Sequence, residues 1–214
     1  DTQVRSDYAS DSLRVGLSGN RFDDLGGGGA SSASVQLTAG RLTDMKAHTL
    51  LATIDRSYRK LTYSLSRQQA VAGEHSLYVA LSGQHATQVL DSSEKFYIGG
   101  ASSVRAYPAS ELGGERGQVA SAEWRWRLHP DLTLSAFVEV GRVVTLATNA
   151  YEQDTALRLH GRGLSLAWQA PLGVSARVTW AHRNGANPKP TLTGTDGDGT
   201  LKKNRVWLVA SVPF

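Results

Sequence analysis

The sequence predicts an all-β fold, an antiparallel transmembrane β-barrel of which about nine strands lie in these 214 residues. Three observations predict it. Apolar and polar residues alternate along almost the whole chain, the pattern of strands with two different faces. One face is nearly all apolar, whereas the other carries Arg and Glu in mid-strand, as a water-filled lumen permits. Short turns and long loops also alternate along the chain.

Nine segments alternate in this way, and a length of about ten residues suits a tilted strand that crosses a bilayer. In chain order they are 12–21, 31–42, 57–69, 75–87, 117–128, 132–144, 157–170, 174–183 and 205–214. The last is the clearest, with apolar residues at every second position from Val206 to Phe214. The aromatic residue Phe214 is the expected C-terminal barrel signal.

The two faces of the strands differ in character. The polar faces of two neighbouring strands carry charges expected to line the lumen, namely Glu123, Arg125 and Arg127 in one strand and Glu139 in the next. A general hydrophilic pore lining is the preferred interpretation of the first three. Four tryptophans lie on the apolar faces, where an interfacial girdle is expected: Trp124, Trp126, Trp168 and Trp180.

The connections predict the orientation in the membrane. The short ones are 22–29, 70–74, 129–131 and 170–172, and the long ones are 43–56, 88–116, 145–156 and 184–204. Short turns are periplasmic in outer-membrane barrels. Every long connection, including the 88–116 loop, is therefore expected at the extracellular end or in the lumen.

Composition excludes several classes of protein. The chain has no cysteine, hence no disulfide framework, and no apolar run long enough for a transmembrane helix. The mean hydropathy of −0.29 looks soluble, but the alternating faces of a barrel cancel in the average. The net charge of +4 does not indicate nucleic-acid binding, because the arginines are spread over many strands. The absence of a signal peptide and of an initial Met predicts a processed protein or a piece of a longer one.

The residues do not predict an enzyme, a cofactor or a metal site. The six histidines are scattered, and no nucleophile-elbow motif occurs. Glycines 26–29 lack the lysine of a phosphate-binding loop and are interpreted as a flexible turn. Residues 195–199, Thr-Asp-Gly-Asp-Gly, lack the distal glutamate of a calcium loop and are interpreted as a plain surface loop.

A loop arginine and a strand carboxylate form the sharpest candidate pair. Arg105 lies in the 88–116 loop, after Gly99 and Gly100, which are expected to release the preceding strand because glycine tolerates positive φ. If the loop enters the lumen, the guanidinium can bind Glu139 through charge-assisted hydrogen bonds. Spacing alone favours the alternative, a solvated arginine and a lumen-lining acid that never meet.

The stretch around this arginine resembles one transporter family. Residues 90–108 read Leu-Asp-Ser-Ser-Glu-Lys-Phe-Tyr-Ile-Gly-Gly-Ala-Ser-Ser-Val-Arg-Ala-Tyr-Pro, followed by Gly-Gly-Glu-Arg-Gly at 113–117 and Ala-Glu-Trp-Arg at 122–125. With Asn-Arg-Phe at 20–22 and Ser-Gly-Gln at 82–84, they resemble the two-partner secretion outer-membrane transporters (TpsB type), the haemolysin-activator and filamentous-haemagglutinin transporter family. The resemblance covers nearly the whole chain and is most specific at 82–125.

The resemblance implies roles for two motifs. The family's lumen-loop motif Val-Arg-Gly-Tyr and its inner-wall motif Phe-x-Asp-x-Gly correspond to Val104, Arg105, Ala106 and Tyr107, and to Phe137, Glu139 and Gly141. Ala106 and Glu139 are mild departures from the family pattern. The resemblance favours the ion pair between Arg105 and Glu139 over the solvated alternative.

The resemblance also implies a sixteen-stranded barrel preceded by a plug helix and two periplasmic POTRA domains. Residues 1–214 correspond to its C-terminal part, roughly the last nine strands. Nine strands leave two open edges, which cannot face lipid. We therefore expect a fragment or truncated product of a longer transporter, with completion of the sheet by another chain as the alternative.

The function implied by the resemblance is export of one large secreted partner, an adhesin or haemolysin, which passes unfolded through the pore without ATP. The implied location is the bacterial outer membrane, and the implied partners are the secreted protein, outer-membrane lipid and the barrel assembly machinery, not nucleic acid. Two alternatives from other classes are a barrel that inserts other outer-membrane proteins and a soluble β-sandwich binding module. An outer-membrane enzyme is a fourth, for which no residue argues.

Overall fold

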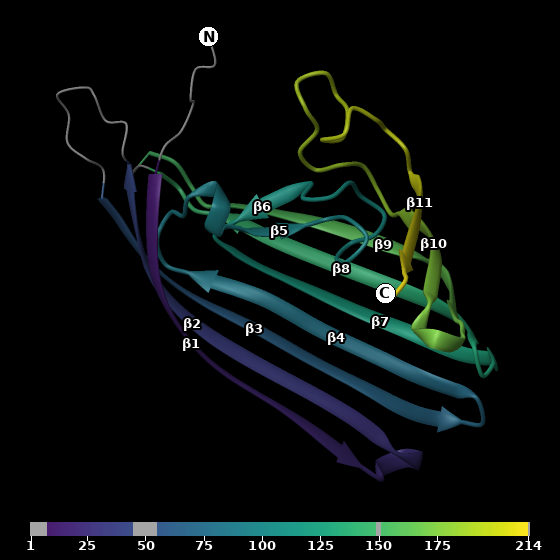
Figure 1. Ribbon diagram of the computed structural model, residues 1–214. Coiled ribbons are helices and arrows are strands. Elements are labelled where there is room, and N and C mark those ends of the chain that lie inside the picture. Colours follow the sequence, from purple (N-terminus) through teal and green to yellow (C-terminus); the bar gives the residue numbers. More distant parts are fainter. Residues whose placement is uncertain (1–7, 45–54, 149–150, 214) are drawn as a thin grey trace.

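The computed structural model describes residues 8–44, 55–148 and 151–213, and nearly all of its regular structure is antiparallel β (Figure 1). Nine strands form one sheet in which each strand pairs with its neighbours in chain order. They are β1 (Tyr8–Asp23), β2 (Gly29–Asp44), β3 (Asp55–Ala72), β4 (His75–Ala86), β7 (Arg116–His129), β8 (Leu132–Thr145), β9 (Thr155–Gln169), β10 (Ser175–Arg183) and β11 (Asn204–Ser211). The fold class expected from the alternation, an antiparallel transmembrane β-barrel of which nine strands are present here, is confirmed.

Each predicted strand corresponds to one observed strand; the first begins four residues earlier than predicted, at Tyr8, and the last ends three residues earlier than predicted. The last strand ends at Ser211, and Pro213 follows two residues later. Proline has no backbone N–H to donate to a ladder, which explains why the strand does not run to the end. Phe214 lies outside the described residues, so its role as a barrel signal stays a prediction.

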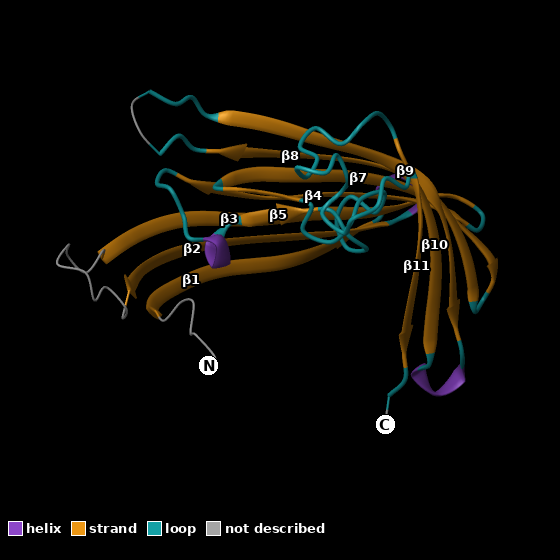
Figure 2. Ribbon diagram, turned by 90° about the horizontal axis from the view of Figure 1, so that it is seen from above, coloured by secondary structure: helices purple, strands orange, loops and turns teal. Residues whose placement is uncertain are grey.

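The sheet bends into an open trough. Seen from above, β10 and β11 stand at a steep angle to β1–β4, and the connection between β4 and β7 lies within the concave side (Figure 2). This connection contains a 3₁₀ turn, η2 (Ser92–Glu94), and a small hairpin of β5 (Phe96–Ile98) and β6 (Leu112–Gly114). We call residues 87–115 the lumen loop.

The connections segregate by length to the two ends of the sheet. The short ones contain η1 (Leu25–Gly27), the turns at 73–74 and 130–131, and η3 (Pro171–Gly173). The lumen loop and residues 146–148, 151–154 and 184–203 lie at the other end, which we call the loop end. No helix among the described residues is long and apolar enough to cross a membrane.

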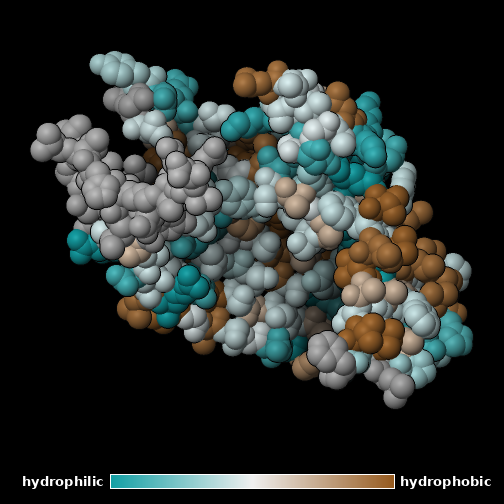
Figure 3. Space-filling model, turned by 45° about the horizontal axis from the view of Figure 1, so that its top comes forward, coloured by the Kyte–Doolittle hydropathy of each residue, from teal (hydrophilic) through white to brown (hydrophobic). Residues whose placement is uncertain are grey.

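The outer face of the sheet is apolar and exposed. Side chains alternate so that Val138 is 58% exposed while its neighbour Phe137, on the inner face, is 4% exposed. The four tryptophans of the predicted girdle, Trp124, Trp126, Trp168 and Trp180, are 44–47% exposed on this outer face. Figure 3 shows apolar side chains gathered at the β10–β11 end of the sheet. Such a face suits contact with lipid.

The main apolar core lies between the lumen loop and the inner wall. The loop contributes Ile98, Val104, Ala106, Tyr107 and Leu112, and the wall contributes Phe137, Val143, Leu159 and Ala181. The loop is therefore packed into the trough, because this cluster is what buries its apolar side chains.

Candidate functional site

The tip of the lumen loop lies flat on the inner faces of β8 and β9. Val104 and Ala106 are fully buried, and Tyr107 is 1% exposed. Two glycines of the wall make room for them. A Cβ added to Gly141 would lie 2.9 Å from Val104 Cγ2, and one added to Gly161 would lie 3.1 Å from Ala106 Cβ. Both distances are shorter than carbon–carbon contact, so the tip can lie this close only because the wall is bare backbone there.

Arg105 binds Glu139 of β8 through two hydrogen bonds. The backbone N–H of Arg105 donates to Glu139 Oε2 over 2.8 Å, and its Nε donates to Oε1 over 2.7 Å. Each residue is 6% exposed. The Glu139 carboxylate thus accepts hydrogen bonds from both the charged side chain and the backbone of Arg105. These two bonds fix the position of the loop backbone as well as that of the arginine side chain.

A second carboxylate, Glu123 of β7, shares the same guanidinium. Arg105 Nη2 donates to Glu123 Oε1 over 2.7 Å, while Arg125 Nε donates to Glu123 Oε2 over 3.0 Å. The Arg105 guanidinium also lies 3.4 Å from the centre of the Phe137 ring, a cation–π contact. The loop residue Arg105 and three wall residues therefore form a chain of alternating acids and arginines, and their charges balance within the group. We call Arg105, Glu123, Arg125 and Glu139 the clamp.

The last strand of the sheet contacts the clamp from the far side of the trough. Trp207 of β11 donates its indole N–H to the backbone carbonyl of Arg105 over 2.7 Å. Sequence reasoning did not identify this residue as part of a site. The signal was present, since Trp207 is the one tryptophan of the sequence on the polar face of its predicted strand.

The start of the loop has the backbone that its sequence predicts. Gly99 and Gly100 have φ of 107° and 97°, in the left-handed region that favours glycine. The N–H of Gly100 donates to the carbonyl of Tyr107 over 3.0 Å, which closes the tip into a compact turn. Ala106 is not among the residues of positive φ, so its methyl group causes no backbone strain where the family motif has glycine.

A second cluster of charges fastens the 184–203 segment above the loop. Asp196 is fully buried and accepts from Arg183 Nη1 over 2.6 Å and from Arg205 Nη2 over 3.1 Å. The expectation of a plain surface loop at 195–199 is therefore wrong for Asp196. Its composition is typical of an exposed turn, but β10 and β11 place two arginines beneath it, and a carboxylate between two guanidinium groups is stabilised although buried.

The same segment is tied to the lumen loop. Glu111 of the loop accepts from the backbone N–H of Gly197, over 3.0 Å to Oε2, and from the side-chain amide of Asn187. Asn187 also donates to Asp196 Oδ1 over 3.0 Å. The outermost acid of the cluster, Asp198, accepts from Arg205 Nη1 over 2.7 Å, and this hydrogen bond holds the pKa of Asp198 well below its ordinary value.

The structure brings most of the predicted site residues together, with one exception. Arg105, Tyr107, Glu139 and Gly141 meet at the wall, and Glu123 and Arg125 join them rather than forming a general pore lining. Arg127 lies apart, near the short turns, where it forms an exposed ion pair with Glu74 over 3.2 Å.

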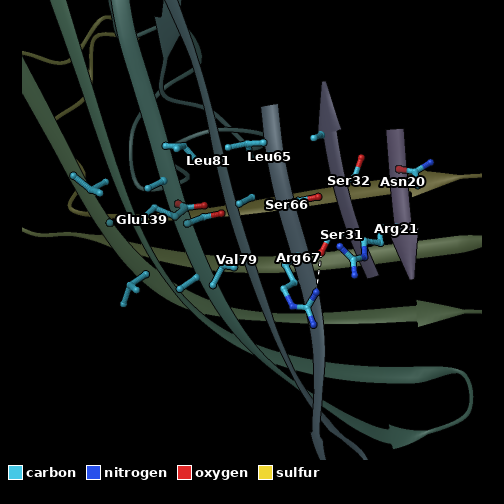
Figure 4. A pocket seen from close by; sticks show the side chains of 18 of the residues that line it. Asn20, Arg21, Ser31, Ser32, Leu65, Ser66, Arg67, Val79, Leu81 and Glu139 are labelled. Atoms are coloured by element: carbon cyan, nitrogen blue, oxygen red, sulfur yellow. Dashed lines mark hydrogen bonds between the residues drawn. The ribbon is translucent and has the colours of Figure 1, made fainter. Parts of the chain in front are cut away.

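Two hollows differ in chemistry. A polar cavity of about 410 Å³ lies beside the clamp and is lined by Arg105, Glu123, Glu139 and Trp207 among others. A larger groove of about 1040 Å³ crosses seven strands, with lining that includes Leu65, Val79, Leu81, Val138 and Val140 (Figure 4). The outward direction of these apolar side chains places this groove on the outer face. The cavity is thus the hollow related to the clamp, and the groove is part of the outer face of the sheet.

A family model shows the family of the chain, and a solved structure shows a similar fold. A family model described as "Haemolysin secretion/activation protein ShlB/FhaC/HecB" matches residues 5–178, most of the chain. Among solved structures, CdiB from Acinetobacter baumannii is similar in fold, with a TM-score of 0.50 at 17% identity over 95% of this chain. The match covers 42% of CdiB, so the chain spans less than half the length of that protein. No curated protein matches the sequence.

Proposed function

This chain belongs to the ShlB/FhaC/HecB family of two-partner secretion transporters, proteins of the bacterial outer membrane, and we propose that it exports one large secreted partner through the pore whose wall it helps to form. We propose further that residues 1–214 are the C-terminal part of a sixteen-stranded barrel. The secreted partner is an adhesin or haemolysin. Family members are transporters, and the chain has no catalytic role in this proposal.

The clamp is the observation that carries the proposal. A loop that only covered a pore would need no buried charge, because burying ions costs free energy unless they are paired. Here one loop residue makes hydrogen bonds to two wall carboxylates and accepts one from a third strand. We propose that the clamp holds the lumen loop in the position that permits secretion.

The inner face supports the passage of an unfolded chain. Small and polar residues such as Ser82 and Ser121 line the cavity beside the clamp. Such a surface offers water and hydrogen bonds to a passing backbone without binding any one sequence tightly. Outer-membrane lipid contacts the apolar outer face, and the barrel assembly machinery inserts the strands.

The test is secretion by the native gene product that carries Arg105→Ala. We expect secretion of the partner to fall to background while the barrel still assembles in the outer membrane. Arg127→Ala is the matched control, because it removes an exposed arginine that lies outside the clamp. Undiminished secretion by Arg105→Ala would overturn the role of the clamp.

Depletion of the protein separates export from assembly. Loss of a single exported protein supports secretion, whereas general loss of outer-membrane proteins supports an insertion function.

A further inference from the structure

The outer wall of β7–β10 changes character from one end to the other. Trp124, Trp126 and Trp168 lie toward the short turns, and Leu, Val and Ala fill most of the middle. Arg142 and Arg158 lie toward the loop end, and Arg162 lies at the middle of β9. Arg142 of β8 and Arg158 and Arg162 of β9 are exposed and alternate with the buried inner-face residues Gly141 and Gly161. We call Arg142, Arg158 and Arg162 the arginine row.

The arginine row carries positive charge that the described protein does not balance. Arg142 and Arg158 are direct partners in the antiparallel ladder, an arrangement in which like charges destabilise the sheet. Arg162 lies four residues along the same face. No ion pair joins these three side chains to a carboxylate among the described residues, and no outward-facing position of β7–β11 is acidic.

The height of Arg142 and Arg158 matches one surface of a membrane, and Arg162 lies four residues below Arg158. Trp168 and Arg158 are ten residues apart on the same face of β9, which is about 33 Å along a strand. At the usual tilt of a barrel strand this is about 25 Å along the membrane normal, the height of the apolar band of outer-membrane barrels. If the tryptophans mark the inner interface, Arg142 and Arg158 stand at the outer one.

The groove on the outer face begins next to the row. His160, between Arg158 and Arg162 on β9, and Val138 and Val140, below Arg142 on β8, belong to its lining. An apolar groove beside a cluster of cations fits a molecule with acyl chains and an anionic head. The apolar groove beside the arginines therefore favours a lipid as the ligand over a free anion.

We propose that the arginine row binds the phosphate groups of lipid A, the phosphorylated saccharolipid of the outer leaflet, with an acyl chain in the adjoining groove. Guanidinium groups bind phosphate oxygens in a bidentate geometry. A phosphate between Arg142 and Arg158 removes the repulsion of the like-charged pair. The loop end is extracellular in this arrangement, so the site lies in the leaflet that contains this lipid.

The test is lipid A binding to the native gene product, purified in detergent and stripped of bound lipid. Bis-phosphorylated lipid A and its enzymatically dephosphorylated form are titrated and the complexes are counted by native mass spectrometry. We expect the unmodified protein to bind the phosphorylated form about tenfold or more tightly, because charge-assisted bonds are lost with the phosphates. We expect Arg142→Gln with Arg158→Gln to remove this preference.

Three controls make the result decisive. Lys202→Gln removes one positive charge from an exposed loop position and should bind lipid A like the unmodified protein. Arg142→Lys with Arg158→Lys keeps the charge and should retain most of the binding. Heat-modifiable electrophoretic mobility reports whether each variant has folded as a barrel.

Three outcomes would overturn the proposal. They are equal binding of the two lipid A forms, unchanged binding by the glutamine variant, and equal affinity for phosphatidylglycerol, which would show general attraction of anionic lipid. The first and third comparisons use the unmodified protein, so they decide the matter even if the glutamine variant fails to fold. Secretion need not change in any of these experiments. The lipid proposal can therefore be confirmed or rejected independently of the export function.

Discussion

Trp207 and Arg105 are 102 positions apart in the sequence, yet the indole N–H of the first donates to the backbone carbonyl of the second over 2.7 Å. This contact connects β11, the last strand of the sheet, to the tip of the lumen loop. The loop is therefore fastened from both walls of the trough, by carboxylates of β7 and β8 on one side and by an indole on the other.

We predict that Trp207→Phe loosens the loop while the barrel stays folded. The substitution keeps an aromatic ring but leaves the carbonyl of Arg105 without its donor, which costs about 1 kcal/mol. Hydrogen exchange of the peptide that spans 99–108 should become about fivefold faster. Trp180→Phe, which changes an outer-face tryptophan, is the control and should leave this exchange unchanged.

We predict that Glu139→Gln destabilises the protein more than Glu123→Gln. Glu139 accepts from both the backbone and the side chain of Arg105, whereas Glu123 can keep Arg125 as a partner. Removing one member of a buried ion pair costs about 3 kcal/mol, and we expect a smaller loss for Glu123→Gln. Urea unfolding of the two variants in lipid vesicles measures the difference, and equal losses would contradict the central position of Glu139.

We predict that Gly141→Leu displaces the loop and raises the conductance of the pore. Even a Cβ at this position would lie 2.9 Å from Ile98 and Val104, so a larger side chain must push the tip off the wall. Single-channel recording of the native gene product in planar bilayers measures the effect. Gly19→Leu is the control, because a Cβ added there meets nothing within 4 Å. Identical currents from both variants would mean that the tip does not obstruct the pore.

We predict that the 184–203 segment stays attached from pH 8 to pH 5 and loosens only in stronger acid. The pKa of Asp198 is lowered in the folded protein, chiefly by its hydrogen bond from Arg205. Its contribution is thus fully present above the unfolded pKa of about 3.9 and is lost as the pH falls through the lower folded value. Hydrogen exchange of this segment, corrected for the intrinsic rate at each pH, should be constant from pH 8 to 5. Loosening near pH 6 would contradict this assignment.

Asp198→Asn should remove this contribution at neutral pH. Its exchange at pH 7 should be faster than that of the unmodified protein and should change little on acidification. Asp154→Asn, an acid in a different loop, provides the comparison.

The strands were predictable from sequence, whereas most of the clamp was not. Alternation follows from the pleat of a strand, so Phe137, Glu139 and Gly141 could be assigned to one face from the sequence. The contact between Arg105 and Glu139 could not be derived from spacing, because it depends on a loop that folds back into the trough. The resemblance to a known family supplied that hypothesis.

The site residues that the sequence did not identify, Trp207 and Asp196, are brought to the site by long-range packing. Trp207 reaches the loop only because the sheet bends between β9 and β11, and residue periodicity carries no information about such a bend. Asp196 lies in a stretch of Thr, Asp and Gly that is typical of exposed turns. Its burial depends on Arg183 and Arg205, which come from two strands on either side of that stretch.

We expect the lumen loop to behave as a two-state element, because so many contacts meet on Arg105. Its side chain and backbone make four hydrogen bonds to three strands. Because about 1.4 kcal/mol changes an equilibrium tenfold, a weakening of one bond leaves the docked state dominant, whereas a movement of the tip by a few ångströms breaks all four together. In the proposed export function, a polypeptide that pushes on the tip would displace it only with enough force to break all four hydrogen bonds together. The loop would then return to the same docked position after each passage.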